Sequence, residues 1–64
     1  MGKQEALQTL VNAMQPLLQA VTGNRQRLII ALLPEVNACL TAGWTMPQVH
    51  AAMDAAIERF VQSL

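Results

Sequence analysis

The segment LTAGWTMPQV, residues 40–49, decides the fold of this chain because it predicts the end of one helix, a tight turn and the start of another helix. Gly43 can adopt the positive φ that often ends a helix. The Thr45 hydroxyl can accept a hydrogen bond from the Gln48 backbone N–H while the Gln48 side chain reaches back, which makes a capping box. The segment therefore predicts two helices joined by a short, well-defined turn.

Three further residues support this turn. Trp44 and Val49 stand where a hydrophobic staple joins the residue before the cap to the fourth helical residue. Pro47 lies in the first turn of the second helix, where its missing N–H costs little. We therefore expect Trp44 to lock two helices together rather than to bind a ligand.

The length and composition of the chain indicate one small helical domain. The chain has 64 residues, of which 53% are apolar and only 3% aromatic, and this composition suits helices better than a β-sandwich or barrel. A domain of this size buries only about 60% of its unfolded surface, and the single cysteine, Cys39, cannot form an internal disulfide. We expect one all-α domain over residues 1–64, stabilised as a homodimer.

Hydrophobic periodicity predicts helices over about residues 3–21, 25–33, 34–42 and 46–63, the last two forming a helix–turn–helix. The opposite face of the first helix carries uncharged glutamine and asparagine side chains. The apolar residues of this helix form one stripe, which is either the core of the domain or a dimer seam: Leu7, Leu10, Val11, Met14, Leu17, Leu18 and Val21.

Proline, glycine and asparagine set the expected boundaries of the middle helices. Pro16 should kink or split the first helix, while Gly23 and Asn24 suit a helix end and the following N-cap. Pro34 is expected to begin a third helix after a break or sharp bend near Leu33. Residues 28–33 are apolar on every side, which predicts a segment buried all round at the centre of the domain or of an oligomer.

The charge pattern narrows the classes of partner. Four basic and four acidic residues give a net charge of zero, which argues against strong non-specific binding to nucleic acid or to an anionic membrane. The longest apolar run, residues 28–34, is far too short to span a bilayer, and no signal peptide is visible. A free Cys39 fits a reducing compartment. We expect a cytoplasmic protein with no membrane partner.

The sequence gives little support to catalysis. Cys39 and His50 are its only nucleophile–base pair of the Cys/His kind, and Cys39 has the pattern of an inward-facing, unreactive thiol. The carboxylates are scattered singly, and the chain has neither a Cys/His cluster for a metal nor a glycine-rich phosphate loop. We expect no enzyme activity, no cofactor, no metal site and no small-molecule substrate.

The predicted helix–turn–helix has the most functional content. In DNA-binding versions a small residue, a turn glycine and locking apolar residues take fixed places, here filled by Cys39, Gly43, Trp44, Val49 and Ala52. Residues 32–36, 42–45 and 48–53 resemble the helix–turn–helix segment of small proteins carried by conjugative plasmids and integrative elements. That resemblance implies a DNA-associated accessory or regulatory role. The turn is also similar to that of ubiquitin-associated domains, which bind proteins.

A DNA-binding role would use five polar or basic residues: Arg25, Arg27, Thr45, Gln48 and His50. Thr45 and Gln48 would read base edges, and the two arginines would contact phosphates. Cations in a first helical turn oppose the helix macrodipole, so Arg25 and Arg27 face a phosphate, a partner's negative charge or Glu35, or form a solvated pair.

Two functions therefore stay open. One is a small DNA-associated regulator or accessory protein of a mobile genetic element. The other is a non-catalytic helical interaction module, such as an adaptor, an assembly subunit or an inhibitor, which the zero net charge and high apolar content favour. The expected partners are a second copy of the chain and either DNA or another protein. The expected oligomer interface is apolar: Leu7, Leu10, Met14, Leu17, Leu28 and Ile29.

Overall fold

A computed structural model describes residues 2–21 and 24–64, and over these residues the chain is helical, without strands. The helices are α1 (Lys3–Val21), α2 (Arg25–Ala31), α3 (Leu33–Thr41) and α4 (Met46–Gln62). The all-α prediction is confirmed, and every predicted helix boundary lies within two residues of the observed one. Gly23 and the side chain of Val21 lie outside the described residues.

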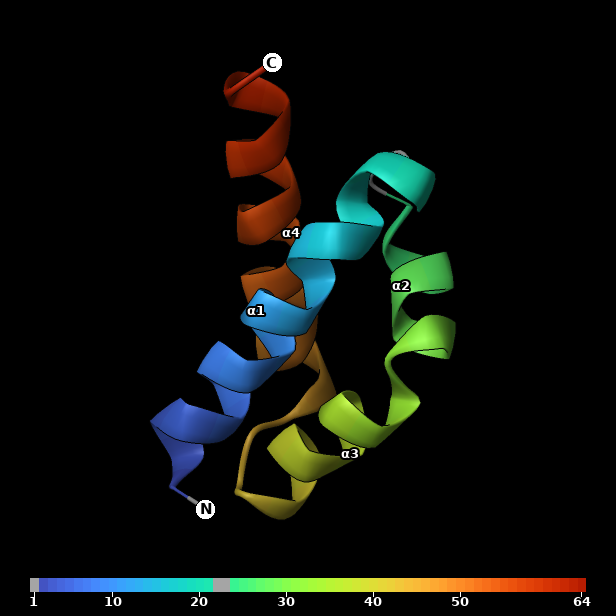
Figure 1. Ribbon diagram of the computed structural model, residues 1–64. Helices are drawn as coiled ribbons and strands as arrows, with labels where there is room; N and C mark the ends of the chain where they lie inside the picture. The colour runs from blue at the N-terminus through green and yellow to red at the C-terminus, as the bar shows by residue number, and fades with distance from the viewer. Residues whose placement is uncertain (1, 22–23) are drawn as a thin grey trace.

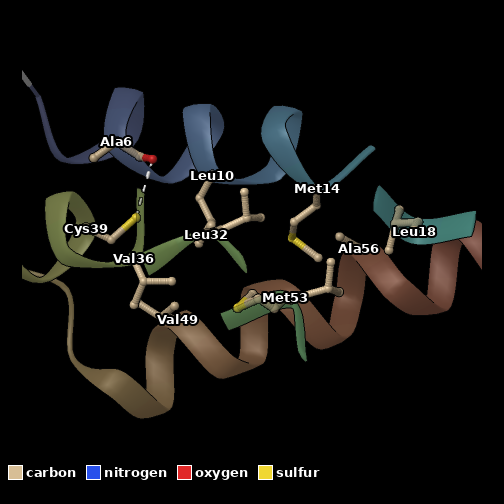
Figure 2. Packing of buried hydrophobic residues seen from close by; sticks show 11 residues of the cluster. Ala6, Leu10, Met14, Leu18, Leu32, Val36, Cys39, Val49, Met53 and Ala56 are labelled. Carbon is tan, nitrogen blue, oxygen red and sulfur yellow. Dashed lines mark hydrogen bonds between the residues drawn. The ribbon is translucent and has the colours of Figure 1, made fainter. Parts of the chain in front are cut away.

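The two long helices form the frame of the molecule. Figure 1 shows α1 and α4 side by side and running in the same general direction, with α3 across the end where both begin and α2 along one edge. Figure 2 shows the core between these helices. All four helices contribute to this core, whose buried residues are Ala6, Leu10, Met14, Leu18, Leu28, Leu32, Val36, Cys39, Val49, Met53 and Ala56.

Helix α1 places a residue in the core at every fourth position from Ala6 to Leu18. Three residues of the predicted stripe are buried in the core together with the small Ala6, namely Leu10, Met14 and Leu18, whereas Leu7, Val11 and Leu17 are partly buried at its edge. Pro16 does not split the helix, which is continuous from Lys3 to Val21. Because Pro16 lies on the exposed side, the stripe stays directed inward.

The turn between α3 and α4 has the predicted chemistry. Gly43 adopts a φ of 114°. Its N–H donates to the Leu40 carbonyl at 3.1 Å, and the Trp44 N–H donates to the Cys39 carbonyl at 3.0 Å, which is the pairing of a Schellman motif. Thr45 then caps α4 with both hydrogen bonds of the capping box. The turn is closed by local hydrogen bonds at both helix ends.

The structure corrects the expectation that residues 28–33 are buried on every side. Leu28 and Leu32 lie in the core, but Ile30 is 65% and Leu33 is 48% exposed. The chain bends at Leu32, whose φ and ψ of −116° and 31° end α2, so only one side of each short helix reaches the core. Helix α3 begins at Leu33, with Pro34 in its first turn.

The N-terminus of α2 is also as predicted. The Asn24 side chain accepts a hydrogen bond from the Arg27 N–H at 3.1 Å and so caps the helix.

The chain exposes 4057 Å² of surface, close to the roughly 4,000 Å² expected of a compact monomer of its mass. The buried apolar residues named above are covered within a single chain.

Candidate functional site

The residues predicted to form an oligomer interface divide into two groups. Leu10, Met14 and Leu28 have no exposed surface within a single chain, so a partner that docks on the folded chain does not touch them. Leu10 and Met14 belong to the predicted apolar stripe and point inward as expected, but the inward direction leads to the chain's own core. Leu7, Leu17 and Ile29 are only partly buried and pack against the edge of that core, so they retain surface for a partner.

Thr45 and Gln48, the two residues predicted to read base edges, form the N-terminal cap of α4. The Thr45 hydroxyl accepts a hydrogen bond from the Gln48 N–H at 3.3 Å. The Gln48 side-chain oxygen accepts one from the Thr45 N–H at 2.9 Å. Both side chains therefore satisfy backbone groups that would otherwise lack partners at the helix end, and their oxygens accept hydrogen bonds within the cap.

Arg25 forms an ion pair within the chain. Its Nη1 donates to Asp54 Oδ2 at 2.6 Å, joining the first residue of α2 to the middle of α4. The two side chains are 41% and 54% exposed, so the pair contributes little to stability, but the charge of Arg25 is compensated. Arg27 and Glu35 form no ion pair within residues 2–21 and 24–64.

His50 lies apart from the α4 cap, in a shallow depression between α2 and α4. The depression has a volume of about 360 Å³ and is lined by Arg25, Gln26, Ile29, Ile30 and His50. The structure therefore brings Arg25 and His50 together, but it does not place them with Thr45 and Gln48. His50 Nε2 is buried and has no hydrogen-bond partner in the described part of the chain.

Cys39 and Trp44 both connect α3 and its turn to the start of α1. The Cys39 thiol donates to the Ala6 carbonyl at 3.3 Å, and burial raises the pKa of this thiol above its usual value. A raised pKa disfavours the thiolate that a nucleophile requires. The Trp44 indole N–H donates to the Lys3 carbonyl at 2.8 Å. Both residues therefore belong to the packing of the fold.

A groove with a volume of about 560 Å³ lies between α1 and α4. Its lining residues have the same spacing on both sides, namely positions 4, 7, 8, 11, 12 and 15 on α1 and positions 52, 55, 56, 59, 60 and 63 on α4 and its C-cap. Each set follows the i, i+3, i+4, i+7 pattern of one helix face. The groove thus presents two parallel stripes to a partner.

The groove combines an apolar lining with amide groups. Leu7 and Val11 from α1 and Phe60 from α4 supply apolar surface, and alanines keep the α4 side shallow. The uncharged glutamine and asparagine face predicted for α1 supplies the polar side. Arg59 is the one charged residue that lines the groove among the described residues. The sequence predicted the glutamine and asparagine face of α1, but it did not show that this face adjoins a face of α4.

No helix in the described ranges combines the length and the apolar character that crossing a bilayer requires. Comparisons with known proteins add no relative. No protein-family model, no curated protein and no solved structure matches the chain.

Proposed function

We propose that this protein is a non-catalytic helical interaction module whose α1–α4 groove receives an amphipathic helix of a protein partner. The groove is the observation that carries the proposal. Its lined stretch, residues 4–15 on α1, is about 16 Å long at the rise of an α-helix. That length matches about three turns of a docked helix, whose residues at positions i, i+3, i+4 and i+7 would contact the groove.

The chemistry of the groove defines the partner more closely. Leu7, Val11 and Phe60 call for apolar side chains on one stripe of the partner helix. Arg59 calls for an acidic side chain at the edge of that stripe, because it is the charged residue in the lining and lies in the last turn of α4. The proposed partner is therefore an amphipathic helix with a leucine-rich face flanked by glutamate.

Fluorescence anisotropy with a labelled synthetic peptide tests the proposal. The probe is an amphipathic helical peptide with leucine at i, i+3, i+4 and i+7 and flanking glutamates, and its control carries lysine in place of glutamate. We expect saturable binding of the glutamate peptide and weaker binding of the lysine peptide. Equal binding of both peptides, or no saturable binding of either, would count against the proposal.

Two alanines on α4 provide a matched pair of variants. Ala55 is exposed and lines the groove, whereas Ala51 is exposed one turn earlier and does not line it. Ala55→Arg should obstruct the groove and abolish peptide binding, while Ala51→Arg should leave binding unchanged. Because both substitutions are at exposed helical positions, both variants should fold.

A DNA-associated accessory or regulatory role, of the kind implied by the resemblance to proteins of conjugative plasmids, is a second proposal. The tight turn that joins α3 to α4 supports it, since DNA-binding helix–turn–helix units require such a turn. The exposed side of α4 carries Asp54 and Glu58, which would repel phosphates. Salt-dependent binding to duplex DNA that is lost in the Arg25→Ala, Arg27→Ala double variant would favour this role over the groove.

A further inference from the structure

The two ends of the α1–α4 groove differ in the backbone charge that they present. Because α1 and α4 run in the same general direction (Figure 1), Gln4 and Ala52 line one end of the groove, and Gln15 and Ser63 line the other. Helix α1 begins one residue before Gln4, and α4 ends one residue before Ser63. A helix is partially positive at its N-terminus and partially negative at its C-terminus. The Gln4 end is therefore the positive end of the groove backbone, and the Ser63 end is the negative one.

This polarity distinguishes the two directions in which a partner helix can lie. A helix antiparallel to α1 and α4 places its positive N-terminus at the Ser63 end and its negative C-terminus at the Gln4 end. Each of its ends then lies beside the opposite partial charge. A parallel helix places like partial charges together at both ends, so the backbone of the groove favours the antiparallel direction.

Arg59 marks the Ser63 end of the groove with a positive side chain. It lies in the last turn of α4, is exposed, and forms no ion pair within residues 2–21 and 24–64. The neighbouring Glu58 does not line the groove, and its carboxylate accepts a hydrogen bond from the Gln62 side chain at 3.4 Å. The Arg59 guanidinium is therefore available to a carboxylate of the partner.

The position of that carboxylate in the partner follows from the dipole of the partner helix itself. An acidic side chain stabilises a helix from its first turn and destabilises it from its last turn. Only in the antiparallel direction does the first turn of the partner reach the Ser63 end. An acid there interacts favourably with Arg59 and with the partner's own N-terminus.

We propose that the partner helix lies antiparallel to α1 and α4, with an acidic residue of its first turn against Arg59. This orientation rests on the proposed function of the groove, to which it adds the direction of the partner helix and the place of its acid. The preferred partner is thus an amphipathic helix whose acidic residues precede its apolar stripe rather than follow it.

Paramagnetic broadening of amide signals measures the direction of a bound helix. The probe is a synthetic peptide with leucine at i, i+3, i+4 and i+7 and glutamate in its first turn, labelled with a nitroxide at either end. The label at the peptide N-terminus should broaden Gln15 and Ser63 most strongly, and the label at its C-terminus should broaden Gln4 and Ala52. The reverse pattern would overturn the antiparallel direction but leave the groove as the binding site. No saturable binding would overturn the proposed function as well.

Arg59→Gln tests the place of the acid with a second peptide, in which the same glutamates stand in the last turn. The substitution should weaken binding of the first-turn peptide about threefold, as expected of an exposed ion pair, and leave binding of the last-turn peptide unchanged. Comparing each peptide with itself removes the difference in helicity between the two peptides. Arg27→Gln is the matched control, because Arg27 is exposed on α2 outside the groove and should affect neither peptide. Equal losses for both peptides, or no loss for either, would overturn the pairing with Arg59.

Discussion

The Trp44 indole N–H donates a hydrogen bond to the Lys3 carbonyl at 2.8 Å, while the Lys3 ammonium lies 4.5 Å from the centre of the Trp44 ring. These two contacts join the first residue of α1 to the turn between α3 and α4, 41 residues away in sequence. A cation at the first position of a helix opposes the macrodipole, and the face of the indole compensates it. Trp44 therefore fixes α1 as well as the turn.

Replacing Trp44 by Phe should lower the free energy of unfolding by about 1 kcal/mol, because the ring stays but the Lys3 carbonyl loses its hydrogen bond. Lys3→Met should cost about 0.5–1 kcal/mol through loss of the cation–π contact. Urea unfolding followed by circular dichroism measures both changes. No loss of stability in Trp44→Phe would show that this hydrogen bond does not hold α1.

Gly43→Ala should destabilise the protein by about 1–2 kcal/mol through backbone strain alone. The reason is the φ of 114°, since a β-carbon there would meet only the Lys3 side chain, at an unstrained 3.9 Å. Gly2→Ala is the matched control, because its nearest contact is also 3.9 Å and its φ is not positive. Thermal unfolding should show a lower melting temperature for Gly43→Ala than for Gly2→Ala. Equal melting temperatures would contradict the predicted backbone strain at Gly43.

Thr45→Ala should lower the free energy of unfolding by about 1 kcal/mol, because it removes the side chain that caps α4. Thr9→Ala is a suitable control, since Thr9 is an exposed residue inside α1, where alanine is the better helix former. Chemical denaturation of both variants makes the comparison. A Thr45→Ala variant as stable as Thr9→Ala would mean that the capping box does not stabilise α4.

The stability of the protein should fall in alkaline solution because of Cys39. Burial raises the pKa of the folded thiol, so the unfolded chain loses the proton first as the pH increases. The stabilisation is thus complete below the ordinary thiol pKa and is lost as the pH rises through the higher pKa of the folded state. Denaturation across this pH range should show a steeper decline for the wild type than for Cys39→Ala; parallel curves would argue against burial of the thiol.

Local chemistry explains why the turn could be predicted from sequence. The Gly43 N–H and the Thr45–Gln48 capping pair form hydrogen bonds across three positions, and short-range preferences of this kind can be recognised without knowing the fold. Asn24 was predictable as an N-cap for the same reason. The interior stripe of α1 followed from helical period alone.

The remaining features depend on contacts between distant residues. Arg25 pairs with Asp54, 29 residues away, and no local pattern selects Asp54 over Glu35. The exposure of Ile30 and Leu33 follows from a bend at Leu32 that leaves each short helix one buried side. The hydrophobic content of residues 28–33 cannot predict this bend or the exposure of Ile30 and Leu33 that follows from it. The α1–α4 groove depends in the same way on two helix faces that become neighbours only in the folded chain.

Amide chemical-shift mapping with the glutamate peptide shows directly whether the proposed α1–α4 groove receives the peptide. We expect the largest shifts on residues 4–15 and 52–63, with Arg59 among them, and smaller changes in the Arg59→Glu variant. Shifts confined to α2 and α3, or no shifts at saturating peptide, would contradict it.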